Sequence, residues 1–321
     1  MGEFDLIQRF FTRPTPRAVL GVGDDCALLQ ARPGMQTAIS CDMLVEGRHF
    51  FADVDPKSLG HKALAVNLSD LAACGAQPQA FTLALALPQA DEAWLQAFSE
   101  GLLRLADAHG CELIGGDTTR GPLNICITVF GEVPAGQALM RSGARADDDI
   151  WVSGTLGDAR LALEHLLGTL ELPPATLAAA RQRLEWPSPR LALGVALRGI
   201  ASACADVSDG LVGDLGHILE RSGVGAELHT PALRACMATQ GEALGAALPR
   251  QLEWIGAGGD DYELVFTAPQ TRRAQVQAAA AQSATPVQRI GRITEGSGLT
   301  LRDTDGRLLP HQFAAFDHFR T

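Results

Sequence analysis

The sequence predicts a mixed α/β protein (α+β) that is built from two domains. Its 321 residues exceed the roughly 250–300 at which a single hydrophobic core stops growing. Short apolar runs typical of strands alternate with segments of helical periodicity along the chain. Between Pro134 and Asp149 the composition shifts to Gly, Ala, Arg and Asp without an apolar period, as in a linker. We therefore expect an N-terminal domain over residues 1–136 and a C-terminal domain over residues 149–321.

The first domain is expected to begin with an amphipathic helix over residues 3–11, which Pro14 and Pro16 terminate. A strand over residues 37–40 then leads to Asp42. The remaining elements follow in order: a helix over 56–75, a strand over 81–87, a helix over 94–105 that Gly110 closes, and strands over 111–115 and 124–133.

The helix over 56–75 has two different faces. Leu64, Leu68 and Leu71 form an apolar stripe, whereas Asn67 and Asp70 belong to a smaller and more polar face. A carboxylate between Leu68 and Leu71 has no local turn to stabilise. This makes Asp70 a candidate functional residue.

The second domain repeats the alternation of strands and helices. Its expected elements are a strand over 150–153, helices over 172–185 and 189–200, a strand over 203–207, a helix that runs to Arg221, and a strand over 262–267. Asp305 and Gly306 are typical of a hairpin turn near the end of the chain.

The charged residues exclude several classes of protein. A formal net charge of −11 disfavours nucleic acid and anionic membranes as partners, and it means that cations must mediate any contact with phosphate. Lys57 and Lys62 are the two lysines of the chain, and neither follows a glycine as in a G-x-x-x-x-G-K-[ST] loop. Neither lies in a V-A-I-K context, so the protein-kinase signature is absent too.

The cysteines and the N-terminus favour a cytoplasmic location. The seven cysteines are scattered and form no C-x-x-C pair, which indicates reduced thiols and no zinc site. Glu3 and Asp5 stand where a secretion signal would be basic. No apolar run approaches the roughly 18 residues of a membrane span.

Aspartates recur where an expected element meets a turn rich in Gly or Ser. They are Asp24, Asp25, Asp42, Asp70, Asp117, Asp206, Asp209, Asp260 and Asp261. If these turns meet at one crevice, several carboxylates stay ionised together only with cations between them. Oxygen ligands favour magnesium, and neighbouring glycines would let backbone N–H groups approach phosphate. The pattern therefore predicts a divalent-metal and phosphate site, although any single Asp is more often a turn or N-cap residue than a catalytic one, and for Asp209 the two explanations have equal weight.

Eight segments together resemble the thiamine-monophosphate kinases, within the superfamily that includes aminoimidazole ribonucleotide synthetase. They are G-V-G-D-D-C-A-L-L, L-V-E-G-R-H-F, K-A-L-A-V-N-L-S-D-L-A-A, L-I-G-G-D-T-T, R-S-G-A, D-V-S-D-G-L, D-Y-E-L and F-D-H-F. The resemblance covers nearly the whole chain. It implies two α/β domains, a homodimer formed through the N-terminal sheets, and transfer of the γ-phosphoryl group of ATP to thiamine monophosphate with several Mg²⁺ ions.

The resemblance also implies a role for individual residues. The implied metal ligands are Asp25, Ser40, the backbone at Cys41, Asp42, Asp70, Asp117, Asp206 and Asp209, with Asp42, Asp70 and Asp117 at the centre of catalysis. The implied ATP contacts are Gly116, Asp117, Arg141 and Ser208. His49, Asp260 and Phe316 are implied to face thiamine monophosphate. Taken alone, His49 would be a half-buried strand histidine, Arg141 a solvated linker residue and Phe316 a core residue.

Two positions depart from the family pattern. Cys41 stands where the family usually has Thr, which removes a hydroxyl but leaves a backbone carbonyl. Asp260 stands where Glu is usual, one methylene shorter, which puts its reach to the substrate in question.

The sequence leaves other functions open. Selenophosphate synthetase would need a reactive Cys or selenocysteine and a Lys near the N-terminus, and residues 1–25 contain neither. The hydrogenase maturation member ends in Cys, whereas this sequence ends Phe-Asp-His-Phe-Arg-Thr. Aminoimidazole ribonucleotide synthetase is harder to exclude, although L-V-E-G-R-H-F and F-D-H-F fit the thiamine enzyme better. A regulator that binds nucleotide and metal without turnover would not need so many aspartates.

Overall fold

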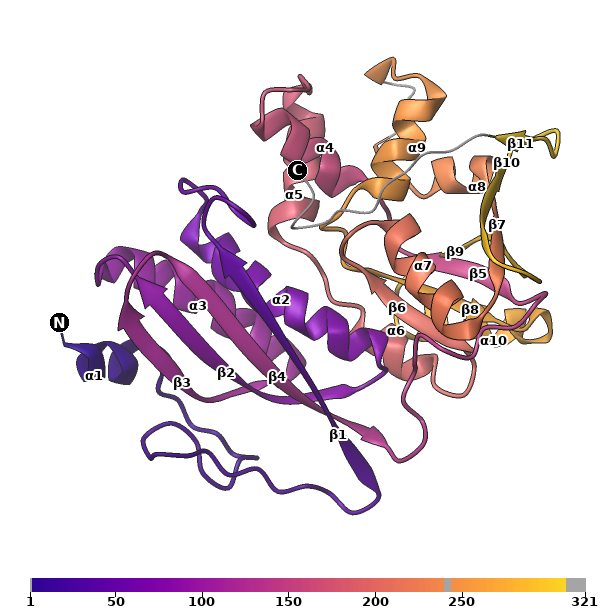
Figure 1. Cartoon of the computed structure of the whole chain (residues 1–321). Coiled ribbons are helices and arrows are strands. Elements are labelled where there is room, and N and C mark those ends of the chain that lie inside the picture. The colour runs from indigo at the N-terminus through magenta and orange to yellow at the C-terminus, as the bar shows by residue number, and fades with distance from the viewer. Residues whose placement is uncertain (1, 240–243, 310–321) are drawn as a thin grey trace. The chain divides into compact units, whose positions relative to one another are not determined.

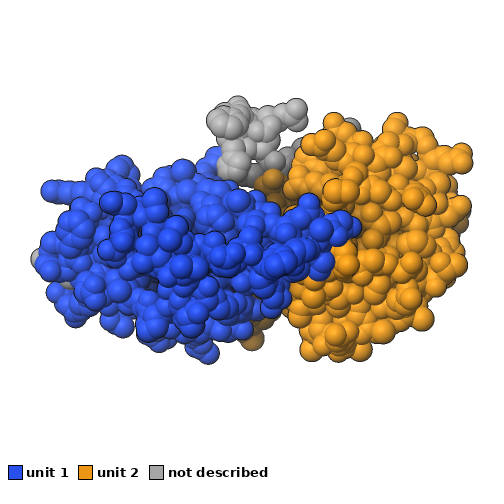
Figure 2. Space-filling view, turned by 90° about the horizontal axis from the view of Figure 1, so that it is seen from below, with its two compact units in different colours: residues 1–71, 76–136 blue, residues 72–75, 137–321 orange. Residues whose placement is uncertain are grey.

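The computed structural model describes residues 2–239 and 244–309. The chain divides into two compact units, which Figure 2 colours separately. The first unit comprises Met1–Leu71 and Ala76–Gly136, and the second comprises Ala72–Gly75 and Gln137–Thr321.

The first unit is a four-stranded sheet with helices on one face (Figure 1). The strands lie in the order β1 (Met35–Val45), β4 (Asn124–Pro134), β2 (Gln77–Leu87) and β3 (Glu112–Arg120). Only the β2–β3 pair is parallel within this sheet. The covering helices are α2 (Pro56–Ala73) and α3 (Glu92–His109). Leu83, Leu85 and Leu87 alternate along β2 and are buried, as expected for a strand with one face packed against helices.

The helices of the first unit follow their sequence signals. Leu64 and Leu68 of the predicted stripe on α2 are fully buried. Asp91 caps α3 by accepting hydrogen bonds from Ala93 N and Trp94 N, and Gly110 ends the helix in the left-handed conformation. At the N-terminus, α1 (Glu3–Leu6) continues into a π-helical turn, η1 (Ile7–Phe11). The predicted helices are thus confirmed.

The second unit contains a seven-stranded mixed sheet. Its strands lie in the order β11 (Leu308–Leu309), β10 (Gly298–Arg302), β7 (Gly225–His229), β9 (Val287–Thr294), β5 (Asp149–Ser153), β8 (Glu263–Ala268) and β6 (Ala203–Val207). Its helices are α4 (Asp158–Leu166), α5 (Pro174–Glu185), α6 (Leu191–Ala196), α7 (Leu211–Ser222), α8 (Thr230–Ala235), α9 (Leu248–Ala257), η3 (Gln270–Arg272) and α10 (Arg273–Gln282). Val152, Val265 and Ile290 on three of its strands are fully buried in the core.

Three predicted strands were too short, and one of them, β2, begins at Gln77 instead of residue 81. β1 continues to Val45 and β3 to Arg120, so Asp42 and Asp117 lie within strands rather than in turns. Pairing decides this, because β1 keeps its register with β4 through Val45 and β3 keeps its register with β2 through Arg120. The predicted hairpin turn is confirmed, since β10 and β11 pair antiparallel around Gly306, whose φ is +77°.

Across the described part of the chain, no helix combines the length and apolar character that crossing a bilayer requires.

Candidate functional site

In the first unit, hydrogen bonds between β1 and α2 bring several predicted site residues together. Ser40 Oγ donates a hydrogen bond to Asp70 Oδ2 at 2.5 Å. The backbone N–H of Asp42 donates to Asn67 Oδ1 at 3.0 Å, and Asn67 Nδ2 donates to Ala63 O at 3.0 Å. Ser40 and Asp42 are two residues apart on a strand and therefore point to the same face, toward α2. The polar face predicted for α2 thus contacts β1 through Asn67 and Asp70.

Cys41 lies on the opposite face of β1. Its Sγ lies 3.4 Å from Sγ of Cys126 on β4, and its neighbours on this face, Ile39 and Met43, are 63% and 53% exposed. Burial raises the pKa of the Cys126 thiol to about 11. A side chain at position 41 therefore points away from Asp42 and Asp70, so the replacement of the usual Thr removes no hydroxyl from that face.

Gly116 and Asp117 lie on β3, at the other edge of the sheet, and both are exposed. Gly116 has φ +149°, and a Cβ there would lie 1.9 Å from Leu83 O. This position admits only glycine, which leaves the backbone bare beside Asp117. Because β4 and β2 separate β3 from β1, Asp117 is three strand spacings from Asp42, about 14 Å.

Asp25 and His49 lie in connecting segments of the first unit. Asp25 is exposed, and its backbone N–H donates to Asp24 Oδ1 at 2.9 Å. His49 is half-buried and lies in the turn after β1, not on a strand; its Nδ1 accepts from Val45 N at 3.0 Å. Phe316 lies outside the described residues.

In the second unit, Ser208 and Asp209 form the turn between β6 and α7. Their backbone N–H groups both donate to Oδ2 of Asp214, at 3.0 and 3.1 Å. The N-cap of α7 is Gly210, with φ +113° and no side-chain cap. The N-cap explanation for Asp209 is therefore wrong, and its half-buried side chain remains without that structural role.

The segment before β8 packs against this turn. Asp260 N donates to Ser208 O at 2.9 Å, and Tyr262 N donates to Val207 O at 2.8 Å. Asp260 and Tyr262 have φ +66° and +49°, a conformation that side chains rarely adopt. Tyr262 Oη lies 3.5 Å from Asp260 Oδ1. Asp261 between them is fully buried.

Asp206 and Arg141 belong to the same region of the second unit. Asp206 is buried near the end of β6, opposite Leu264 of β8. Arg141 is exposed, but it is close enough to Asp214 for its positive charge to act on the pKa of that carboxyl group. The pKa of Asp214 is raised to about 7, mainly by burial and then by the charge of Asp209, while Arg141 and the two backbone N–H groups oppose the rise.

The predicted residues therefore fall into two groups. The first unit gathers Ser40, Asp42 and Asp70 and leaves Asp117 on the opposite edge of its sheet. The second unit gathers Arg141, Asp206, Ser208, Asp209 and Asp260. Among the residues that the structure describes, no three His, Cys, Asp or Glu side chains are close enough to hold a metal by themselves.

This donor chemistry still fits magnesium. Half-buried carboxylates and a hydroxyl are hard oxygen donors, and Mg²⁺ is usually bound by one or two carboxylates together with waters and substrate phosphates. Sites with few protein ligands are what a triphosphate bridged by cations would require, because phosphate oxygens and waters complete the coordination of Mg²⁺. The bare backbone at Gly116 is a separate place at which N–H groups could meet phosphate.

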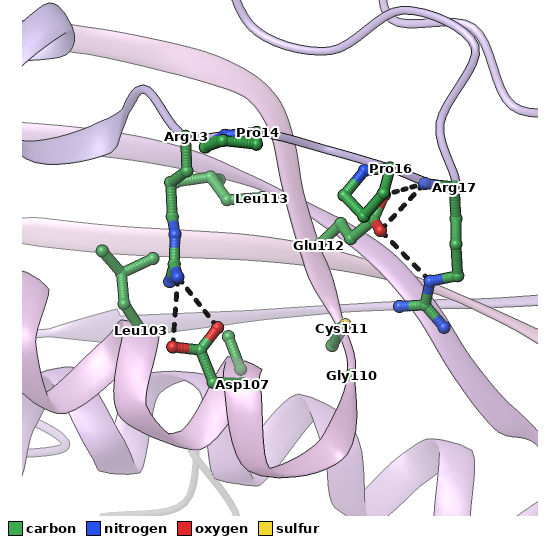
Figure 3. Close-up of a pocket in the computed structure, with 11 residues that line it drawn as sticks. Arg13, Pro14, Pro16, Arg17, Leu103, Asp107, Gly110, Cys111, Glu112 and Leu113 are labelled. Atoms are coloured by element: carbon green, nitrogen blue, oxygen red, sulfur yellow. Dashed lines mark hydrogen bonds and ion pairs between the residues drawn. The ribbon is translucent and has the colours of Figure 1, made fainter.

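A cavity of about 270 Å³ lies elsewhere in the first unit (Figure 3). Its charged lining residues are already paired: Arg13 lies 3.0 Å from Asp107, and Arg17 Nε lies 3.2 Å from Glu112. Glu112 also accepts the backbone N–H groups of Arg17 and Ala18 at 3.0 Å each. None of the predicted site residues lines this cavity, whose contacts anchor the N-terminal segment.

Sequence reasoning missed the residues that support the site. The sequence indicates Asn67 only as part of a polar helix face, and Asp261 only as one of an acidic pair. Asp214 had one signal, an acidic side chain in the first turn of a helix that follows S-D-G-L. The short distance between Asp214 and the preceding turn is apparent only in the folded chain.

Comparisons with known proteins cover the whole chain. Residues 23–133 match the AIR synthase related protein, N-terminal domain, and residues 135–304 match the corresponding C-terminal domain. The thiamine-monophosphate kinase of Salmonella typhimurium is 45% identical over 100% of this chain and 99% of the relative. The enzyme of that name from Bacillus subtilis is 33% identical over 100% of both chains.

Solved structures agree. Thiamine-monophosphate kinase from Stenotrophomonas maltophilia K279a superposes with a TM-score of 0.81 at 43% identity, covering 95% of this chain and 96% of that one. AaThiL complexed with AMPPCP and TMP superposes with a TM-score of 0.76 at 30% identity, covering 90% and 89%. From this similarity along its full length, the chain belongs to the thiamine-monophosphate kinase family.

Proposed function

We propose that this chain catalyses the ATP-dependent phosphorylation of thiamine monophosphate to thiamine diphosphate, the last step of thiamine diphosphate biosynthesis. The observation that carries the proposal is the relative at 30% identity that was solved with AMPPCP and TMP, because an ATP analogue and the acceptor are bound by one protein of this fold. The two groups of oxygen donors support it, since both anionic reactants need cations beside an acidic protein.

The proposed reaction is a direct in-line transfer. An oxygen of the acceptor phosphate forms a bond to the γ-phosphorus of ATP, and the bond from that phosphorus to the β–γ bridging oxygen breaks as ADP leaves. The acceptor oxygen is largely ionised near neutral pH, because the second pKa of a phosphate monoester is about 6. The protein therefore needs no strong general base, and its contribution is positioning and charge stabilisation.

Each group of residues has a proposed task in this scheme. Bound Mg²⁺ would neutralise the charge that develops on the transferring phosphoryl group. The proposed metal ligands are Asp25, Ser40, the backbone at Cys41, Asp42, Asp70, Asp117, Asp206 and Asp209. Gly116, Arg141 and Ser208 would contact ATP, and His49, Asp260 and Phe316 would contact the acceptor.

We also propose that two copies associate through the sheet of the first unit. Its free face exposes Ile39 and Met43 on β1, at 63% and 53%, while α2 and α3 cover the other face. Sedimentation velocity tests this proposal: the wild type should sediment as a dimer, and Met43→Glu should shift it toward the monomer.

We propose a cytoplasmic location, because the cytoplasm keeps thiols reduced and therefore suits the seven free cysteines.

The activity is tested by incubating the protein with ATP, Mg²⁺ and one acceptor at a time while ADP release is followed. ADP should form with thiamine monophosphate, and thiamine diphosphate should appear in equal amount. ADP formation only with another acceptor would assign the chain to a different enzyme of the superfamily. No ADP with any acceptor would favour a regulator without turnover.

A further inference from the structure

Asp214 on α7 is a buried carboxylate to which the proposed reaction gives no role. It is 2% exposed, and its Oδ2 accepts two hydrogen bonds, from Ser208 N at 3.0 Å and from Asp209 N at 3.1 Å. A carboxylate oxygen that accepts two backbone N–H groups fixes two consecutive peptide planes. The orientation of the turn between β6 and α7 therefore depends on this side chain.

The same turn supports the segment that carries Asp260. The carbonyl of Ser208 accepts the N–H of Asp260 at 2.9 Å. The two segments touch so closely that a Cβ on Gly259 would lie 2.6 Å from Ser208 O. A displacement of the turn would thus be passed on to Asp260, because no space separates the segments.

We propose that Asp214 is a positioning residue for phosphoryl transfer. By holding the N–H groups of Ser208 and Asp209, it sets the place at which the Asp209 carboxylate meets the divalent cation and at which Ser208 meets the nucleotide. Through Ser208 O it also sets the backbone at Asp260. The inference rests on the proposed function, and it assigns Asp214 no contact with substrate or metal.

The chain supplies a matched control in Asp158. This residue is also 2% exposed and lies in the second unit, and it accepts two consecutive backbone N–H groups, from Ala238 at 3.1 Å and Thr239 at 2.9 Å. The segment that it holds contains none of the proposed site residues. Asp158→Ala therefore reproduces the loss of a buried carboxylate and two hydrogen bonds in a segment without a proposed metal ligand. Because the Asp158 charge also acts on Asp261, next to Asp260, the metal quantities are the ones compared.

The experiment compares the wild type with Asp214→Ala, Asp214→Asn and Asp158→Ala. Three quantities are measured: Mn²⁺ binding in the presence of AMPPCP by electron paramagnetic resonance, the Mg²⁺ concentration for half-maximal ADP formation, and hydrogen exchange of the peptide over residues 203–214. Asp214→Ala should weaken Mn²⁺ binding and raise the half-saturating Mg²⁺ concentration by about 10–100-fold, the usual effect of removing an outer partner of a metal ligand. Asp214→Asn keeps one acceptor oxygen and should lie between it and the wild type.

Asp158→Ala should leave both metal quantities within about twofold of the wild type, although its thermal unfolding temperature falls as in Asp214→Ala. Equal metal binding in Asp214→Ala and Asp158→Ala would overturn the inference. If Asp214→Ala does not fold, Asp214→Asn decides: faster exchange over residues 203–214 with weaker Mn²⁺ binding supports the inference, and wild-type values overturn it. A wild type that binds Mn²⁺ but releases no ADP would refute the proposed function alone.

Discussion

The two units position their candidate site residues by different physical means. In the first unit, Ser40, Asp42 and Asp70 lie on a strand and a helix, and their spacing follows from the sheet register and the helical repeat. In the second unit, Asp209 and Asp260 lie in turns. Regular elements hold side chains by hydrogen bonds shared with many neighbours, whereas a turn depends on a few specific contacts.

The turns of the second unit are held by buried carboxylates. Asp214 accepts two N–H groups of one turn, and both carboxylate oxygens of Asp261 accept from Gly157 N, at 2.9 and 3.0 Å. A buried polar group is costly unless it is hydrogen-bonded, so the stability of each turn depends strongly on one residue. Substitutions should therefore affect chemistry alone in the first unit, but chemistry together with local folding in the second.

The largest effect is expected from Asp42→Asn in the first unit. The amide keeps the size of the side chain but removes a charge from the proposed metal shell. We expect kcat/KM for thiamine monophosphate to fall by about 10²–10³-fold, with the thermal unfolding temperature nearly unchanged. Asp107→Asn, which removes an exposed ion-pair partner in the same unit, is the control and should keep full activity. Wild-type turnover of Asp42→Asn at limiting Mg²⁺ would refute the metal assignment.

Gly210→Ala should break the second unit's turn by steric means. The backbone there has φ +113°, and the added Cβ would lie 2.9 Å from the carbonyl carbon of Ala257. We expect a loss of about 2–4 kcal/mol in the free energy of unfolding, measured by urea titration. Gly136→Ala also has a positive φ but open space around it, and it should cost only about 1 kcal/mol. Equal losses would show that the turn is less constrained than its contacts indicate.

Asp261→Asn should change how stability depends on pH. Burial, the main cause, raises the pKa of Asp261 in the folded chain above its ordinary value, while the Gly157 N–H and Arg183 oppose the rise. The folded state thus holds this proton more tightly, so the resulting stability is complete below the unfolded pKa of about 4 and is lost as pH rises toward the folded pKa.

The variant has no such proton. Its free energy of unfolding, measured by urea titration from pH 4 to pH 8, should therefore improve relative to the wild type as pH rises. Parallel curves for the two proteins would contradict the raised pKa.

The smallest effect is expected from Cys41→Thr, which restores the residue usual in the family. The side chain faces Cys126 and not Asp42 or Asp70, so kcat/KM should change by less than about twofold. A larger gain in Mg²⁺ affinity would mean that the position 41 side chain does reach the metal shell. Cys126→Ser, which alters the same contact from the β4 side, is the control.

Local signals predicted much of the fold. The helix α2, the end of α3 at Gly110 and the hairpin around Gly306 all followed from residues near one another in sequence, whereas α2 is buried on nearly all sides rather than along one stripe. The ends of β1 and β3 did not, because the segments around Asp42 and Asp117 have the composition of turns and are strands only through pairing with β4 and β2. The helices α4 and α8–α10 and the strands β7, β9 and β10 were not predicted, although α4 and α9 do have an apolar side.

The sequence by itself determined the residue types that are available: an acidic chain with scattered aspartates beside glycines, which predicts a site for cations and phosphate, and motifs that resemble one family. The tertiary structure alone decided which of those aspartates lie together, that the Cys41 side chain faces away from Asp42, and that Asp214 holds the turn of Asp209. Composition states which atoms are available, whereas register and burial depend on contacts between distant segments.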